Sequence, residues 1–171
     1  TSVSFPDLTD VWMAINTNNN TNDYTLSTPN LTQCPTISHQ DDSITSIDYS
    51  ALQTTFGFDV EETKLSVIDL PFLIIAKNYV EINGNLYLST IAFNSLANVN
   101  GYFGISNNPV LTSINLSALI GVGGEFSLYG CDALASLSLP ALASVESYFS
   151  CSSNAALASL SLPALASVEG G

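Results

Sequence analysis

The chain has almost no positive charge. Its 171 residues include no arginine and two lysines, Lys64 and Lys77, against 15 acidic residues, so the formal net charge is −13. Such a balance repels the phosphates of nucleic acids and anionic membrane surfaces. No apolar run approaches the roughly 20 residues of a membrane span. We therefore expect neither a nucleic-acid partner nor membrane insertion.

Residues that carry chemistry are also scarce. There is one histidine, His39, and the three cysteines Cys34, Cys131 and Cys151 have no metal-ligand spacing. We interpret His39 as a surface-loop residue, because no reactive serine or cysteine signature accompanies it. At least one cysteine must be unpaired. We favour free thiols for all three, and a Cys131–Cys151 bridge is the alternative.

Acidic residues concentrate ahead of residue 65. Oxygen ligands suit calcium, but their spacing matches no calcium loop, so we favour a solvated acidic face over a metal site. The residues concerned are Asp41, Asp42, Asp48, Asp59, Glu61 and Glu62.

What the sequence does contain is a repeat. Five leucines recur at one constant spacing, i to i+23, namely Leu65, Leu88, Leu111, Leu134 and Leu157. From each of the first four leucines, apolar residues recur at offsets 3, 5, 8, 11, 15 and 17, and the fifth unit follows the pattern as far as Val168. Residues 134–146 recur letter for letter as 157–169. Such self-similarity predicts a solenoid, in which each coil buries its apolar face against its neighbours.

Alternation within each unit predicts strands rather than helices. Ile114-Asn-Leu116 and Phe126-Ser-Leu128 alternate apolar and polar residues, and Pro, Gly and Asn separate such segments. The fold class that we predict is all-β, a parallel β-solenoid of 23-residue coils. A filled, narrow solenoid has no cleft for catalysis, so we expect no enzyme and no cofactor.

Two segments precede the regular coils. Residues 44–64 resemble an irregular coil that is slightly shorter than the others, so we assign residues 44–171 to the solenoid, with the last coil incomplete. Residues 1–43 have no repeat phase. We interpret them as an N-terminal capping segment, in which the apolar run from Val11 to Ile15, with Trp12, covers the end of the first coil. A separate small binding module is the alternative.

The string Phe103-x-Ile105-x-x-Asn108-x-x-Leu111 resembles the leucine-rich repeat consensus. Residues 103–124 are similar to the coils of the receptor L-domain family and of related fungal cell-wall surface proteins. This resemblance implies extracellular display, often with glycosylation. It also implies inward-pointing asparagines that bond the backbone from coil to coil, with a rung lost or weakened at Cys131. In this sequence they are Asn85, Asn108 and Asn154.

Two outward rows are candidate partner faces. Small side chains, including Ser113, Ser136 and Ser159, predict a flat wall suited to lateral packing. Exposed aromatic rings can stack on sugars or anchor a protein, although they also cover strand edges. The tyrosines concerned are Tyr79, Tyr102, Tyr129 and Tyr148.

We expect an extracellular, cell-surface protein that is structural or adhesive and works by self-association or by binding other surface proteins. The last coil stops at Glu169 and two glycines without a polar cap, so either the chain continues or this end docks on another subunit. The alternative function is recognition of a glycan or protein through the tyrosines. Three sequons are candidate N-glycosylation sites, namely Asn19, Asn30 and Asn115.

Overall fold

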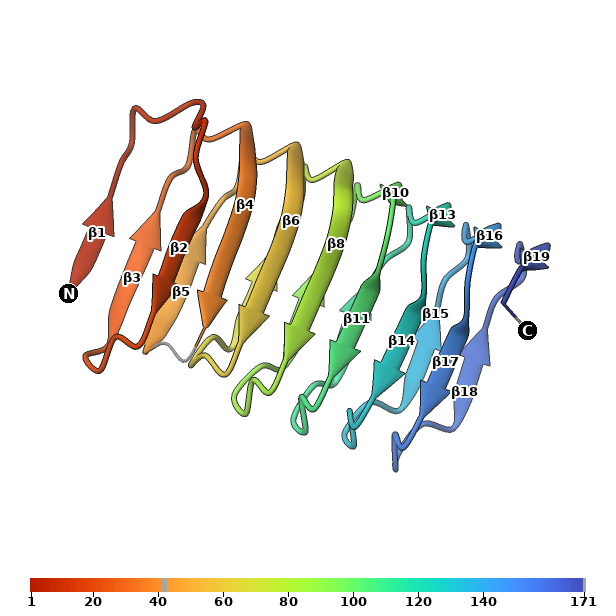
Figure 1. The fold of residues 1–171 in the computed structure, drawn as a ribbon. Helices are drawn as coiled ribbons and strands as arrows, with labels where there is room; N and C mark the ends of the chain where they lie inside the picture. The colour runs from red at the N-terminus through yellow and green to blue at the C-terminus, as the bar shows by residue number, and fades with distance from the viewer. Residues whose placement is uncertain (41–42, 171) are drawn as a thin grey trace.

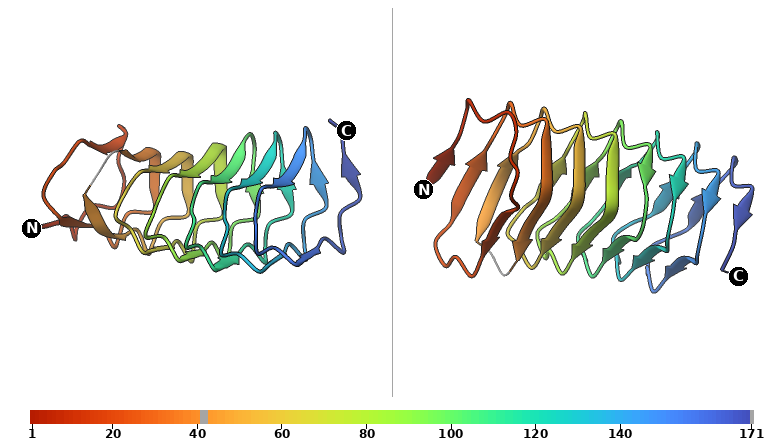
Figure 2. Two further views of the ribbon diagram at one scale, coloured as in Figure 1. Left: turned by 90° about the horizontal axis from the view of Figure 1, so that it is seen from below. Right: turned by 45° about the horizontal axis from the view of Figure 1, so that its top comes forward.

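The protein is an all-β, parallel β-solenoid of about seven coils. The computed structural model describes residues 1–40 and 43–170, and it contains no helix in these ranges. The chain winds along one axis, with its two ends at opposite ends of the coil stack (Figure 1). Two walls of strands face each other across the interior, and turns join them (Figure 2).

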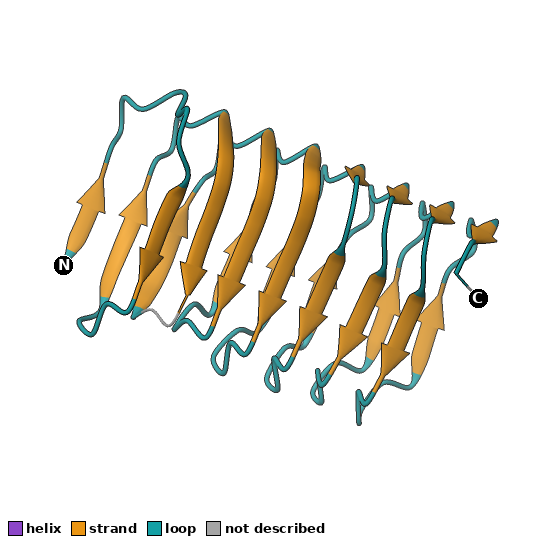
Figure 3. Cartoon of the chain, viewed as in Figure 1, coloured by secondary structure: helices purple, strands orange, loops and turns teal. Residues whose placement is uncertain are grey.

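One wall is a long parallel sheet, continuous from the first coil to the last. Three of its strands in the earlier coils are long and bent, whereas each later coil contributes two shorter strands (Figure 3). The long row comprises β2 (Ile15–Asn18), β4 (Gln33–Gln40), β6 (Thr54–Glu61), β8 (Ile75–Asn83), β11 (Phe103–Ser106), β14 (Phe126–Tyr129) and β17 (Phe149–Ser152). A second row, of shorter strands, also begins at β8. It comprises β10 (Asn98–Val99), β13 (Gly121–Val122), β16 (Ser144–Val145) and β19 (Ser167–Val168).

The opposite wall consists of three smaller parallel sheets. The first contains β1 (Ser2–Ser4), β3 (Tyr24–Ser27) and β5 (Ile44–Asp48). The second contains β7 (Val67–Asp69), β9 (Thr90–Ala92) and β12 (Ser113–Asn115). The third pairs β15 (Ser136–Ser138) with β18 (Ser159–Ser161).

Strand register gives the length of each coil. From β8 onward the inward residues Val80, Phe103 and Phe126 pair in sequence, at a constant spacing of i to i+23 (103 − 80 and 126 − 103). The earlier pairs Ile15↔Ile37, Ile37↔Phe58 and Phe58↔Val80 have shorter and unequal spacings (37 − 15, 58 − 37 and 80 − 58). Residues 1–40 therefore carry strands that pair in parallel with those of the following coils.

The core is a set of rows along the axis. The repeat leucines Leu65, Leu88, Leu111 and Leu134 are all fully buried. Beside them the rings of Phe103 and Phe126 stack at 5.2 Å between centroids, and Phe126 stacks on Phe149 at 4.9 Å. Exact repetition in a parallel ladder places like residues side by side, so one favourable contact recurs in every coil.

Asparagines line one turn of the coil. The side chain of Asn85 is buried, and its Nδ2 donates to the carbonyl oxygens of Val60 (2.9 Å) and Asn83 (3.0 Å). The backbone N–H of Asn85 donates to Oδ1 of Asn108 in the next coil (3.0 Å). These bonds satisfy backbone groups that the turn would otherwise bury without partners.

The residue before the asparagine position has a left-handed backbone in successive coils, with φ between 51° and 70° at Glu62, Gly84, Asn107, Gly130 and Ser153. Glycine and asparagine tolerate this conformation better than most residues. The recurring turn geometry therefore explains why Gly or Asn stands at three of these five positions.

Two expectations about single residues are wrong. The Trp12 side chain is 91 % exposed and does not cover the end of a coil, because the extra N-terminal coils already bury the interior there. His39 lies on β4, not in a surface loop, and is fully buried. Its Nδ1 lies 2.6 Å from Oγ1 of Thr17 and its Nε2 lies 3.0 Å from the hydroxyl of Tyr49.

Candidate functional site

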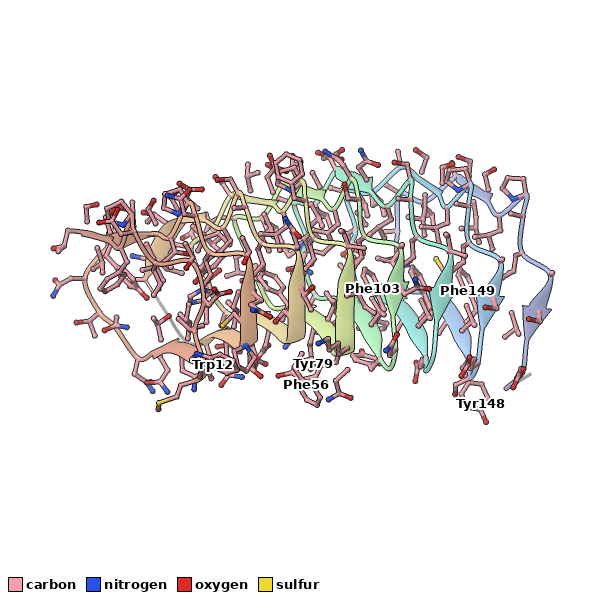
Figure 4. All side chains as sticks on the ribbon, turned by 90° about the horizontal axis from the view of Figure 1, so that it is seen from above. Trp12, Phe56, Tyr79, Phe103, Tyr148 and Phe149 are labelled. Carbon is pink, nitrogen blue, oxygen red and sulfur yellow. The ribbon has the colours of Figure 1, made fainter. Side chains whose placement is uncertain are left out.

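The outer surface of the long sheet carries a group of exposed aromatic side chains near its N-terminal end. We call Trp12, Phe56 and Tyr79 the aromatic patch. They lie on the outer side of the wall, whereas Phe103 and Phe149 lie within it (Figure 4). Trp12 is 91 % and Phe56 51 % exposed, and Tyr79 is half-buried.

A local irregularity of strand pairing lies opposite Phe56. Strands β6 and β8 pair as Thr55↔Ala76 and then Gly57↔Tyr79, so the partner strand has one extra residue at this point. Such a bulge bends the strand and changes the direction of the side chains near it. The extra residue lies in the segment Lys77–Asn78 of β8, opposite Phe56 and directly before Tyr79.

Beside the bulge lies a cavity of about 210 Å³, between Trp12 and Phe56. Asp10, Gln33 and Lys77 contribute its polar groups. Oδ1 of Asp10 accepts hydrogen bonds from Nε2 of Gln33 (2.9 Å) and from Oγ1 of Thr32 (3.3 Å). The site thus combines two aromatic walls with a carboxylate, an amide and an ammonium group.

Two polar rows continue along the outer side of the same sheet. In the first, Ser38, Asp59 and Glu81 stand side by side on β4, β6 and β8. Ser38 donates to Asp59 (3.1 Å), and Nε2 of Gln40 donates to the same carboxylate oxygen, Oδ2 (2.5 Å). In the second row, Asn83 donates to Glu61 (2.7 Å).

Asp59 corrects the expectation of a solvated acidic face, because its side chain is only 7 % exposed. Burial raises the pKa of its carboxyl group above the usual range, and the bonds from Gln40 and Ser38 offset part of that rise. Burial also raises the pKa of Glu81, and the nearby Asp59 and Glu61 carboxylates add to the rise. Asp41 and Asp42, from the same predicted cluster, lie outside the described residues.

The four predicted tyrosines divide into two pairs. Tyr79 and Tyr102 are half-buried and lie over glycines: Tyr79 over Gly57 of the preceding coil, and Tyr102 over Gly104, two residues further along the chain. Tyr129 and Tyr148 are more exposed, at 46 % and 55 %. Tyr148 lies along the same outer wall as the aromatic patch but several coils away (Figure 4).

On the opposite wall the predicted serine row is exposed. Ser136 pairs with Ser159 in a parallel ladder, and Ser113 pairs with Thr90. The sequon residues Asn19, Asn30 and Asn115 are also exposed. Nδ2 of Asn30 donates to the carbonyl oxygen of Pro6 (2.7 Å), and Nδ2 of Asn115 donates to Oδ1 of Asn94 (2.6 Å).

All three cysteines are free thiols, with Cys34 and Cys131 buried and Cys151 half-buried. At Cys131 the asparagine ladder is altered, because the backbone N–H still donates to Oδ1 of Asn154 (2.9 Å) but the thiol replaces the amide. Burial raises the pKa of the Cys131 thiol to about 11, so it is protonated at neutral pH.

Within residues 1–40 and 43–170 no three His, Cys, Asp or Glu side chains cluster closely enough to hold a metal ion. The same ranges include no helix with the length and apolar character of a membrane span.

Comparisons with protein-family models, curated proteins and solved structures found no match to this chain.

Sequence reasoning missed Trp12 and Phe56 as surface residues. In an apolar run such as residues 11–15, burial is the ordinary expectation, and no repeat phase indicated which side chains point outward. A search that allowed slightly shorter, unequal coils would have aligned Ile15 with Ile37 and Phe58. That alignment places Trp12 and Phe56 outside the inward rows.

Proposed function

We propose that this protein is a non-enzymatic recognition and adhesion module of the cell surface, which binds glycans through the outer face of its long sheet. The observation that carries the proposal is the exposed aromatic patch beside the hydrogen-bonded polar rows. A cluster of exposed apolar side chains marks an interaction site, and aromatic rings stack on the apolar faces of sugars. The Ser, Asn, Gln and carboxylate groups of the rows match sugar hydroxyl groups, which both donate and accept hydrogen bonds.

The rigidity of the site supports this function. Strands β4, β6 and β8 hold Phe56, Tyr79 and the polar rows, and the side chains of the rows are already bonded to one another. A surface held in place loses little conformational entropy when it binds a ligand. The net charge of −13 favours neutral over anionic glycans.

A glycan array tests the proposal directly. We expect the labelled wild-type chain to bind a set of neutral glycans and the double variant Trp12→Ala/Phe56→Ala to lose at least tenfold in signal. Phe72 and Tyr87 are each 59 % exposed and lie outside the patch, so Phe72→Ala/Tyr87→Ala is the matched control and should bind like the wild type. An array without binding by the wild type, or equal loss in both variants, would reject glycan recognition.

We also propose that the chain is related to receptor L-domains and to fungal cell-wall surface proteins. The support is the Phe-x-Ile-x-x-Asn-x-x-Leu string at residues 103–111, together with the bonds that Asn85 and Asn108 make between coils. This relationship, with three exposed sequons, supports an extracellular location. Secretion from a eukaryotic host followed by glycan mapping at Asn19, Asn30 and Asn115 tests it, and an unmodified secreted chain would count against the glycoprotein assignment.

A structural role in an assembly is the second candidate. The observation that favours it is the exposed ladder of serines on the opposite wall, where Ser136 pairs with Ser159 and no side chain projects far. Two such walls could pack laterally. Sedimentation at increasing concentration should then show association that Ser136→Arg/Ser159→Arg abolishes, and a monomer at every concentration would reject this role.

A further inference from the structure

We propose that the cavity between Trp12 and Phe56 binds one neutral pyranose ring of a glycan. The inference rests on the proposed function and specifies the ligand and the residues that hold it. The remaining sugars of a longer glycan would lie along the outer face of the sheet.

The size of the cavity selects the ligand. Its volume of about 210 Å³ is below the roughly 300 Å³ at which sites for drug-sized ligands begin. A single sugar ring is therefore a better match than an oligosaccharide. The lining includes Cys34 and Thr55, which are buried on β4 and β6, so part of the cavity is built on strands of the long sheet.

The two aromatic walls provide the apolar contact. The carbon-bound hydrogens on one face of a pyranose present an apolar surface, and aromatic rings carry negative charge on their faces, so the two attract. Because Trp12 is 91 % exposed and Phe56 51 % exposed, covering them removes a substantial apolar area from water.

The polar groups provide the orientation. Both hydrogen bonds to Asp10 are made by Oδ1, so Oδ2 has no hydrogen-bond partner among the described residues. Gln33 donates through Nε2, and its Oε1 stays available as an acceptor. Lys77 adds three donors, and it is outside the single ion pair found in the described ranges, which joins Lys64 to Asp23. A carboxylate, an amide oxygen and an ammonium group together match adjacent hydroxyl groups of a sugar.

Charge argues for a neutral ring. An anionic sugar would be attracted by Lys77 but repelled by Asp10 and by a chain of net charge −13. A cationic side chain of a peptide would be repelled by the ammonium group of Lys77, which lines the cavity. Hydroxyl groups are compatible with all three polar side chains.

Trp12 makes the inference measurable, because it is the single tryptophan of the chain. The experiment is fluorescence of the full chain, with iodide and acrylamide quenching, during titration with methyl glycosides of glucose, galactose and mannose. Methyl glucuronide and a lysine-rich peptide are the charged comparison ligands. Thermal melting of each variant shows that it is folded.

We expect at least one neutral glycoside to shift Trp12 emission to shorter wavelength and to reduce the quenching constant at least twofold. Asp10→Ala and Phe56→Ala should weaken the apparent affinity at least tenfold, whereas Phe72→Ala should not change it. No response to any neutral glycoside, or a response to the glucuronide or the peptide alone, would overturn the inference. If the array shows Trp12-dependent binding but the titration shows no change, glycan recognition stands and the single-ring site is rejected. A blank array rejects the proposed function itself.

Discussion

The ring of Tyr102, the residue directly before β11, lies over Gly104 of that strand. Alternate residues of a strand share a face, so any side chain at position 104 would project into the ring, and a Cβ built there meets the Tyr102 hydroxyl and ring carbons. Tyr79 covers Gly57 of the preceding coil in the same way, with its Cε1 2.5 Å from a Cβ built on that glycine. These tyrosines therefore protect the backbone of the sheet as well as forming part of its outer face.

The replacement Gly104→Ala should destabilise the protein by about 1–3 kcal/mol, because the methyl group displaces the Tyr102 ring. Tyr102→Ala removes the obstruction, so the double variant should lose less stability than the sum of the two single variants. Urea unfolding of all four proteins measures this coupling. Additive effects would show that the ring and the glycine do not interact.

Cys131 occupies the position that asparagine fills in the neighbouring coils. Its thiol donates a long hydrogen bond, 3.7 Å, to the carbonyl oxygen of Tyr129, whereas Asn108 donates to two carbonyl oxygens at 2.9 and 3.0 Å. We therefore expect Cys131→Asn to raise the free energy of unfolding by about 1 kcal/mol, the net value of one typical hydrogen bond. Cys131→Ala is the control and should be less stable than the asparagine variant; the opposite order would contradict the ladder interpretation.

Tyr49 provides the hydroxyl that contacts the buried His39. Both residues are buried, and their rings stack with centroids 6.0 Å apart. Tyr49→Phe keeps the ring but leaves Nε2 of His39 without this hydroxyl, which should cost about 1–3 kcal/mol. Tyr129→Phe removes an exposed hydroxyl and should change the melting temperature little. Equal effects of the two variants would argue against the buried contact.

The raised pKa of Asp59 makes the stability of the protein depend on pH. Since its pKa is higher in the folded than in the unfolded protein, the folded state binds the proton more tightly. Its protonation favours folding below the unfolded pKa, and this benefit disappears as pH rises through the folded pKa. Asp59→Asn should therefore melt higher than the wild type at pH 7, and the difference should shrink on acidification below pH 4. Asp132→Asn, at an exposed position, is the control.

The regular coils could be predicted from the sequence because their constant length appears as a constant spacing of apolar residues. A fixed coil length returns inward positions at the same interval, so Leu65, Leu88 and Leu111 recur in phase and all three are buried. Alternating residues such as Ile114 and Leu116 indicated strands for the same reason.

The N-terminal coils could not be found in this way. They are shorter than the regular coils and unequal in length, which breaks the phase, and the pairing of β3 with β5 and of β6 with β8 includes a register shift. Parallel pairing depends on backbone hydrogen bonds, which tolerate an extra residue in a turn or bulge. A constant sequence spacing, in contrast, is lost when a coil gains or loses a residue.

The amino-acid sequence alone therefore predicts the repeat, the strands and the inward rows of side chains, because these depend on local alternation and a constant coil length. The aromatic patch depended on how unequal coils stack, since a shift of one residue reverses the side of the sheet on which a side chain lies. That stacking exposed Trp12, buried His39 and Asp59, and brought Asp10, Phe56 and Lys77 from three different coils to one cavity.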